Sequence, residues 1–470
     1  MDDHVKDEQL YSLFKNFVFE AFPLIDPALD KHWFKPRYDK YPSLKYKENG
    51  MPDLFNFSDS GPYKIANLFK SWSGKADIEL NEIGSYDILK KYVLSHKNHI
   101  DTIYTDNMDK DDRNRYEYLA TAIIEDVLER YYLLNKSKQE YEILFKDIYI
   151  EIENYIYADK LNFDIGIPIL FLQFEMEEFS INENILVRKI TDDYQKARFN
   201  IRSYSPPVTD SIVAGSTHEL VFKNYEIKKG KKYFDTSLNN EKAYPLDLME
   251  LFFNAVKIVT NYNSGFAQIL VYPHKWTDFY NKDLPTLKGL TVRKYPNYFD
   301  DYYWNNDSFP KLSTAEGEEI ASFYRNLLVA ENNKIRIANR RLRSSYLRDN
   351  EEDSILDIII ALETLLSDNE KGELTYKLSM RIAKLLSVYS SNHEAIQVFA
   401  AVKKIYEYRS AVVHGSHKSD SKKREVKLHK EGKPIPTISL ANDYLREVIG
   451  ILMQHPKYLD SKEIDKLMLL

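Results

Sequence analysis

The C-terminal third of the sequence has the clearest pattern of apolar and polar positions. From about residue 316 onward, apolar residues recur every three or four positions, the period of a helix with one buried face. Ser313 and Glu316 have the spacing of a capping box at the start of this region. Since most connections are short, residues 311–470 are expected to form an all-α bundle. The predicted helices are 316–348, 354–366, 374–388, 396–415 and 440–453.

The N-terminal two thirds predict a mixed α/β region. A first amphipathic helix is expected to end at Pro23, and residues 116–158 are strongly helical. The period then changes to that of β-strands. We therefore expect an α+β protein with a mostly helical region (1–158), a β-containing sensor or recognition domain (159–310) and the C-terminal bundle (311–470). The predicted strands are 163–174, 185–190, 218–227 and 266–272, with a helix at 246–260.

Composition narrows the range of functions. The formal net charge of −7 does not suggest a general nucleic-acid binder, so any RNA contact requires a local basic patch. The absence of cysteine excludes disulfides, zinc ribbons and cysteine nucleophiles, and is typical of a reducing compartment. His96 and His99 are three residues apart, but surface histidines are a simpler interpretation than metal ligands. With no secretory signal or membrane-length apolar segment visible, we expect a cytoplasmic protein without metal or cofactor.

Arg409 and His414 stand out in the predicted helix 396–415. Arg409 continues the apolar face of this helix, where a guanidinium is unfavourable unless it is paired or faces a polar interface. His414 follows five residues later, next to Gly415, where the helix is expected to end. Taken alone, the pair also fits an Arg that bonds helix-end carbonyls and a His that favours the negative end of the helix dipole. The apolar face consists of Ile396, Phe399, Val402, Ile405 and Tyr406.

Three segments of the bundle together resemble a known family. They are ILDIIIALETLL (355–366), LSMRIAKLL (378–386) and IYEYRSAVVHG (405–415). Their order and motifs resemble the Apea-like HEPN domain, with its "ALExLL", "RxAxLL" and "YxxRSxxVHG" segments. The resemblance covers roughly residues 315–456, about a third of the chain.

The resemblance implies a metal-independent endoribonuclease whose substrate is RNA, with tRNA among the candidates. Such proteins often act as toxins or abortive-infection effectors against phage, and a phage-derived trigger would then act on the N-terminal region. HEPN domains generally form homodimers in which two Arg-x4–6-His motifs face one cleft. Arg409 and His414 would be catalytic, and Ser410 matches the motif's usual polar position.

The residue types suit cleavage by the RNA's own 2′-hydroxyl. An imidazole can remove that proton or protonate the leaving 5′-oxygen, and a guanidinium can stabilise the phosphorane. One imidazole does not easily serve both sides of the displacement, so a composite site in a dimer is expected. The apolar stripe that carries Arg409 also requires a cover, which is either a second copy or the N-terminal region of the same chain.

The sequence is less specific about the residues that would support Arg409 and His414. Glu363 is expected either to orient Arg409 or His414, or to form a buried ion pair with Arg381. His417 is either a second imidazole or a surface residue. Tyr406 is a further supporting residue, and the predicted RNA-binding residues are Arg340, Arg341, Arg343, Lys418, Lys422 and Lys423.

The competing hypothesis for the function is a non-catalytic bundle used for dimerisation or nucleotide binding.

Overall fold

The computed structural model divides the chain into two compact units that interleave along the sequence. The N-terminal unit comprises residues 1–168, 184–244 and 267–293, and the C-terminal unit comprises 169–183, 245–266 and 294–470. This differs from the three consecutive domains expected from the sequence. The residues that the structure describes are 4–31, 37–57, 61–69, 76–95, 113–201, 208–228, 238–302, 306–368, 373–413, 424–428 and 433–469.

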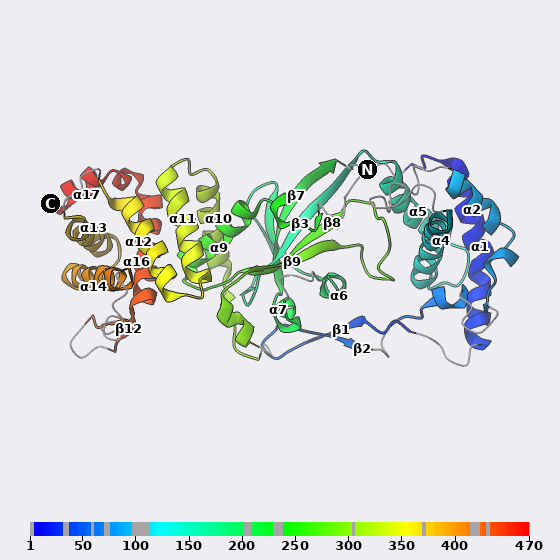
Figure 1. Ribbon diagram of the computed structural model, residues 1–470, viewed down its shortest axis with the longest axis horizontal. Coiled ribbons are helices and arrows are strands. Elements are labelled where there is room, and N and C mark those ends of the chain that lie inside the picture. The colour runs from blue at the N-terminus through cyan, green and yellow to red at the C-terminus, as the bar shows by residue number, and fades with distance from the viewer. Residues whose placement is uncertain are drawn as a thin grey trace. The chain divides into compact units, whose positions relative to one another are not determined.

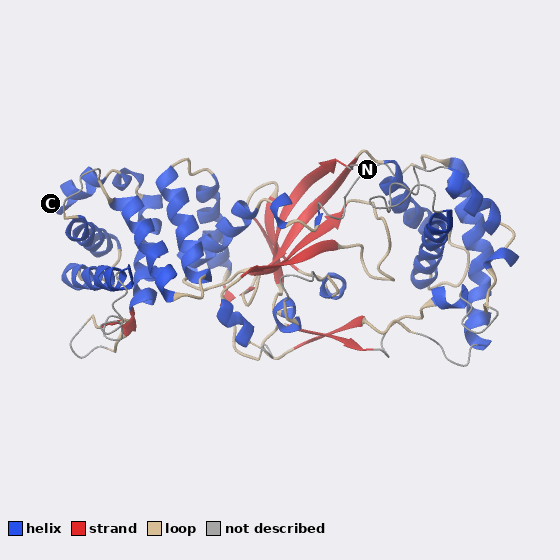
Figure 2. Cartoon of the chain, viewed as in Figure 1, coloured by secondary structure: helices blue, strands red, loops and turns tan. Residues whose placement is uncertain are grey.

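Part of the N-terminal unit is helical (Figure 2). The large aromatic side chains of these helices form one core of the unit. The first helix does not end at Pro23, because its buried face continues through Ile25, Ala28 and Leu29. Tertiary packing therefore outweighs the local effect of proline on the helix. The helices are α1 (Glu8–Lys31), α2 (Tyr86–Ser95), α4 (Arg113–Leu134) and α5 (Glu142–Tyr157).

The strand predictions correspond to a six-stranded sheet of order β5-β6-β7-β3-β8-β9. β3 pairs antiparallel with both β7 and β8, and β6 pairs antiparallel with β7. The predicted strand 163–174 is divided, since β3 ends at Pro168 and Phe171 has a positive φ of 53° before β4. The strands are β3 (Lys160–Pro168), β4 (Gln173–Phe174), β5 (Glu178–Ser180), β6 (Ile185–Lys189), β7 (His218–Lys228), β8 (Phe266–Pro273) and β9 (Lys288–Lys294).

The segment after β8 joins the sheet to the helices of the N-terminal unit, so the two predicted regions share one unit. Arg130 of α4 donates to the carbonyls of Lys282 and Leu284, at 2.6 and 2.8 Å. The Tyr280 side chain is buried in the helical core. The smaller elements are β1 (Tyr41–Tyr46), β2 (Pro52–Phe57), α6 (Asp192–Phe199), α7 (Asp210–Ala214), η1 (Ile65–Phe69), η2 (Leu80–Glu82) and η3 (Glu241–Ala243).

The C-terminal unit contains the expected helical bundle, with α9 and α17 as additional helices (Figure 1). Helix α9, from the predicted β-containing domain, packs on α10, α11 and α16 through a strongly apolar face. The capping box of Ser313 and Glu316 is confirmed. The helices are α9 (Leu246–Thr260), α10 (Thr314–Leu328), α11 (Asn333–Leu347), α12 (Glu351–Leu366), α13 (Leu374–Tyr389), α14 (Ala395–Val413), α16 (Thr437–Gln454) and α17 (Ser461–Met468).

The long helix expected at 316–348 is two helices, α10 and α11. Asn332 caps α11 by accepting a hydrogen bond from the backbone N–H of Lys334, which starts a new helix after a break. None of the described helices combines the length and apolar character needed to cross a membrane. The remaining elements are β10 (Lys311–Leu312), which pairs with β4, the small hairpin β11 (Glu425–Val426) and β12 (Ile435–Pro436), η4 (Asn297–Asp301) and η5 (Pro456–Leu459).

Candidate functional site

Helix α14 packs into its own bundle along most of the apolar stripe predicted from the sequence. Val402, Ile405 and Tyr406 are buried, and α14 contacts α12, α13 and α16. Ile396 is an exception, because its side chain is 84% exposed. The other helices of the bundle therefore cover the stripe. Neither a second copy nor the N-terminal region is needed for that purpose, which corrects the packing argument for a dimer.

Arg409 is half-buried in the last turns of α14, on the side that faces the bundle. Its Nε is buried, and the described residues supply no hydrogen-bond partner for it. A buried donor without a partner is unfavourable by roughly 1–3 kcal/mol, so the Nε itself does not stabilise the fold. The Nε atoms of Arg130, Arg343 and Arg446 also have no partner, but each of those arginines donates to a carbonyl through another nitrogen. The interpretation of Arg409 as a cap for helix-end carbonyls has no hydrogen bond to support it in the described part of the chain.

A tyrosine and a carboxylate lie beside Arg409. The Tyr406 hydroxyl donates to Oε1 of Glu363 on α12, at 3.4 Å. Burial and the Glu363 charge raise the pKa of Tyr406, while the positive charge of Arg409 opposes that rise. The guanidinium is therefore close enough to the hydroxyl to act on it electrostatically. Glu363 and Tyr406 are thus bonded between α12 and α14, with Arg409 near Tyr406. The described residues show no hydrogen bond between Glu363 and Arg409, so a role of Glu363 in orienting Arg409 stays a prediction.

The other motif residues are only partly described. Ser410 is exposed on the last turn of α14. The predicted catalytic His414 and the supporting His417 lie outside the described residues, as do Lys418, Lys422 and Lys423. His96 and His99 also fall outside them.

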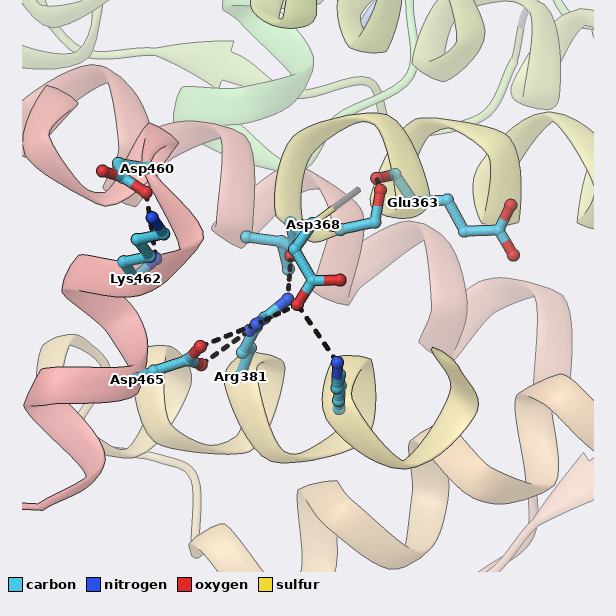
Figure 3. Close-up of polar contacts among 9 residues, drawn as sticks. Glu363, Asp368, Arg381, Asp460, Lys462 and Asp465 are labelled. Carbon is cyan, nitrogen blue, oxygen red and sulfur yellow. Dashed lines mark hydrogen bonds and ion pairs between the residues drawn. The ribbon is translucent and has the colours of Figure 1, made fainter. Parts of the chain in front are cut away.

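Arg381 is a structural residue in a separate ion-pair cluster (Figure 3). Its side chain is 2% exposed and donates twice to Asp465, at 2.8 and 2.7 Å. It also donates to Asp368 and to the carbonyl of Leu366, each at 2.8 Å. The hydrogen bonds from Arg381 to Asp465 raise its pKa. The predicted alternative of a Glu363–Arg381 pair is wrong, since these acceptors satisfy Arg381 instead.

The predicted RNA-binding arginines of α11 have three different environments. Arg343 is buried and donates to the carbonyls of Ser264 and Lys294 and to the Tyr346 hydroxyl, which does not fit contact with RNA. Arg341 pairs at 2.5 Å with the buried carboxylate of Asp357. Arg340 is exposed. The helical period could have indicated the burial of Arg343, because it follows Ile335 by eight residues on the same face.

The N-terminal unit contains a polar cavity that the sequence did not suggest. It has a volume of about 360 Å³, and three carboxylates of α4 line it: Glu125, Asp126 and Glu129. Asp126 accepts from the backbone N–H of Tyr280 at 2.7 Å, and burial raises its pKa to about 7. Glu129 accepts from the backbone N–H of Ile65. These bonds hold neighbouring segments together, so the structure assigns the carboxylates a packing role.

The described residues contain no group of three or more metal-ligating side chains with suitable geometry. Comparisons with protein-family models, with characterised proteins and with solved structures find no match to this chain.

Proposed function

We propose that the chain is an endoribonuclease of the HEPN type that cleaves RNA at the site of Arg409 and His414. The main supporting observation is that Arg409, which is half-buried beside Tyr406 and Glu363, has no hydrogen-bond partner for its Nε in the described residues. A guanidinium that makes no hydrogen bond to the described residues is suited to bind a phosphate. The three HEPN-like sequence segments indicate the same site, Arg409 and His414, independently of the hydrogen bonding.

The proposed reaction requires no external nucleophile. The 2′-hydroxyl attacks the adjacent phosphorus, the bond to the 5′-oxygen breaks, and a 2′,3′-cyclic phosphate and a 5′-hydroxyl are formed. His414 would transfer a proton at one oxygen, and Arg409 would stabilise the additional negative charge of the phosphorane. A second proton-transfer group is also needed. It is either His414 of another copy, in the shared cleft that the resemblance implies, or His417 of the same chain.

The proposed biological role is that of a toxin or effector in anti-phage defence, with the N-terminal unit as the part that receives the trigger. This role rests on the resemblance alone. The competing proposal is a non-catalytic bundle that dimerises or binds a nucleotide. The environment of Arg409 favours catalysis, because none of the hydrogen bonds among the described residues involves its guanidinium, whereas Arg381 donates to two carboxylates and a carbonyl.

The test is incubation of the full chain with total RNA and a panel of tRNAs, with and without EDTA, alongside His414→Ala. We expect products with 2′,3′-cyclic or 3′-phosphate ends, equal cleavage in EDTA, and no cleavage by the variant. Cleavage that EDTA abolishes and only Mg²⁺ restores would contradict the mechanism. Equal cleavage by His414→Ala would indicate a contaminating nuclease or another site.

A further inference from the structure

Two adjoining cavities lie in the C-terminal bundle beside α13, which packs against both α14 and α17. The first, which we call the apolar cavity, has a volume of about 290 Å³ and is lined by α13, the start of α14 and Met468 of α17. The second, the polar cavity, has a volume of about 400 Å³ and lies between α13 and α17. Met380 and Met468 line both, so the two cavities share a wall.

The apolar cavity is narrow and opens at the surface. Its lining includes Ala383 and Ala395, whose small side chains leave space between α13 and α14, and the larger side chain of Phe399. Ile396, which also lines the cavity, is 84% exposed, so the mouth lies at the surface. The two helices each contribute about one turn, residues 380–384 and 395–399. A partner helix binds through anchors spread over two or more turns, so the cavity is better suited to one slender apolar chain.

The charged groups that line the two cavities favour an anion. In the polar cavity, Arg381 already pairs with both carboxylates, Asp368 and Asp465, at 2.8 and 2.7 Å (Figure 3). Lys377 of α13 and Lys462 of α17 line the same cavity from different helices. Across both cavities, four basic side chains stand against these two acidic ones, so the lining has a net positive charge. The four are Lys377, Arg381, Lys384 and Lys462.

We propose that the two cavities form one binding site for a single-chain aliphatic anion, such as a fatty acid. The hydrocarbon chain lies in the apolar cavity, where it is removed from water, and the carboxylate lies in the polar cavity beside Lys377 and Lys462. The shared wall at Met380 permits this, because Lys377 and Met380 are three residues apart and lie on one face of α13. The unbranched side chains of the two methionines can adjust to chains of different length.

This site is separate from the one proposed for RNA cleavage. Phe399, in the apolar cavity, precedes Arg409 by ten residues on α14, which is about 15 Å along the helix axis. The ligand would therefore occupy one end of α14 and leave the other end, with Arg409 and Tyr406, accessible. Binding of an aliphatic anion does not depend on the proposed function, and a failure of either proposal leaves the other standing.

Calorimetric titration of the full chain with decanoate, below its critical micelle concentration, tests the ligand class. We expect one saturable site with a dissociation constant of about 10–100 µM, the range for a small ligand of this size. Decanol has the same chain without the charge and should bind at least about fivefold more weakly. Butanoate has the charge but a short chain and should show no measurable binding. Absence of saturable decanoate binding, several equal sites, or equal affinity for decanol would overturn the proposal.

Single substitutions locate the site on the chain. Ala395→Leu fills part of the apolar cavity, and Ile396→Asp places a negative charge at its mouth. Each should weaken decanoate binding at least about tenfold, and both positions are exposed, so the fold should be retained. Lys462→Glu should weaken decanoate at least about fivefold and leave decanol unchanged. Lys404→Glu, the same charge change at an exposed position of α14 outside both cavities, is the control and should stay within about twofold of the natural chain. If Ala395→Leu and Ile396→Asp both bound decanoate as the natural chain does, the site would lie elsewhere.

A membrane surface also presents aliphatic chains with anionic groups, so a second arm of the experiment separates the two sources. The full chain is sedimented with vesicles of phosphatidylglycerol. We expect it to stay in the supernatant, because the apolar cavity takes one chain and does not form the broad apolar face of a membrane-bound helix. A chain that pellets with the vesicles, and no longer does so with Ile396→Asp, would show that this surface inserts into a bilayer. That result would overturn the proposal of a free single-chain ligand.

Discussion

Arg381 and Arg409 are arginines on neighbouring helices of one bundle, and each belongs to one of the HEPN-like segments. Arg381 is almost fully buried and is satisfied by Asp368, Asp465 and a carbonyl. Arg409 is more accessible, and its Nε has no partner among the described residues. The difference indicates that Arg381 contributes to stability, whereas the proposed function makes Arg409 the arginine that binds a ligand. Helical periodicity alone does not distinguish the two.

The largest expected effect is on activity, at Arg409 and His414. Replacing either by Ala should reduce RNA cleavage at least about a hundredfold, the usual result of losing a transition-state donor or a general acid–base. The melting temperature of Arg409→Ala should be close to that of the natural chain, because the described structure shows no hydrogen bond from the Arg409 Nε that the change would remove. If folded Arg409→Ala cleaved RNA at the rate of the natural chain, Arg409 would have no functional role that distinguishes it from Arg381.

The matched change at Arg381 should affect stability instead. Arg381→Ala leaves Asp368 and Asp465 without their cation and is expected to lower the unfolding free energy by about 3 kcal/mol. The measurement is denaturant unfolding, with Arg381→Lys as the conservative control. The folded fraction should keep its activity per molecule. A loss of activity in a protein of unchanged stability would place Arg381 in the site.

Changes next to Arg409 should have smaller effects. Tyr406→Phe removes the hydroxyl that bonds Glu363 and is expected to reduce activity about fivefold, which corresponds to about one net hydrogen bond. Because KM reports on binding in the ground state, a change mainly in kcat would support a positioning role. If Tyr406→Phe and Glu363→Gln both retain full activity, the Tyr406–Glu363 pair does not position Arg409.

The smallest effect is expected at Asp126 in the N-terminal unit, a buried carboxyl beside a second carboxyl, Glu129. Because burial raises the folded-state pKa of Asp126 to about 7, its contribution to stability is complete below pH 4 and is lost as the pH rises through 7. Asp126→Asn should therefore unfold a few degrees higher than the natural chain at pH 8, with a smaller difference at pH 5. A difference that does not depend on pH would show that Asp126 has an ordinary pKa.

Local patterns in the sequence determined most of the secondary structure. The bounds of α9 agree with the prediction at both ends, and those of β8 differ by one residue. The capping box at Ser313 was also found, because its chemistry involves residues only three apart. The predicted start of the motif helix, Ile396, is one residue after that of α14, and its predicted end at Gly415 lies outside the described residues. Such features depend on interactions within a few residues, which one sequence contains in full.

Only the tertiary structure decided which side chains meet. Packing between distant segments places α9 in the bundle and continues α1 past Pro23. It also buries the side chains of Arg381 and Arg343. The packing also decided which face of α14 is buried, because α12, α13 and α16 cover one side of the helix and leave the other exposed. The partners of a buried charge are often distant in sequence, as Asp465 is from Arg381. Periodicity can therefore identify a buried position, but it cannot identify the group that satisfies the charge there.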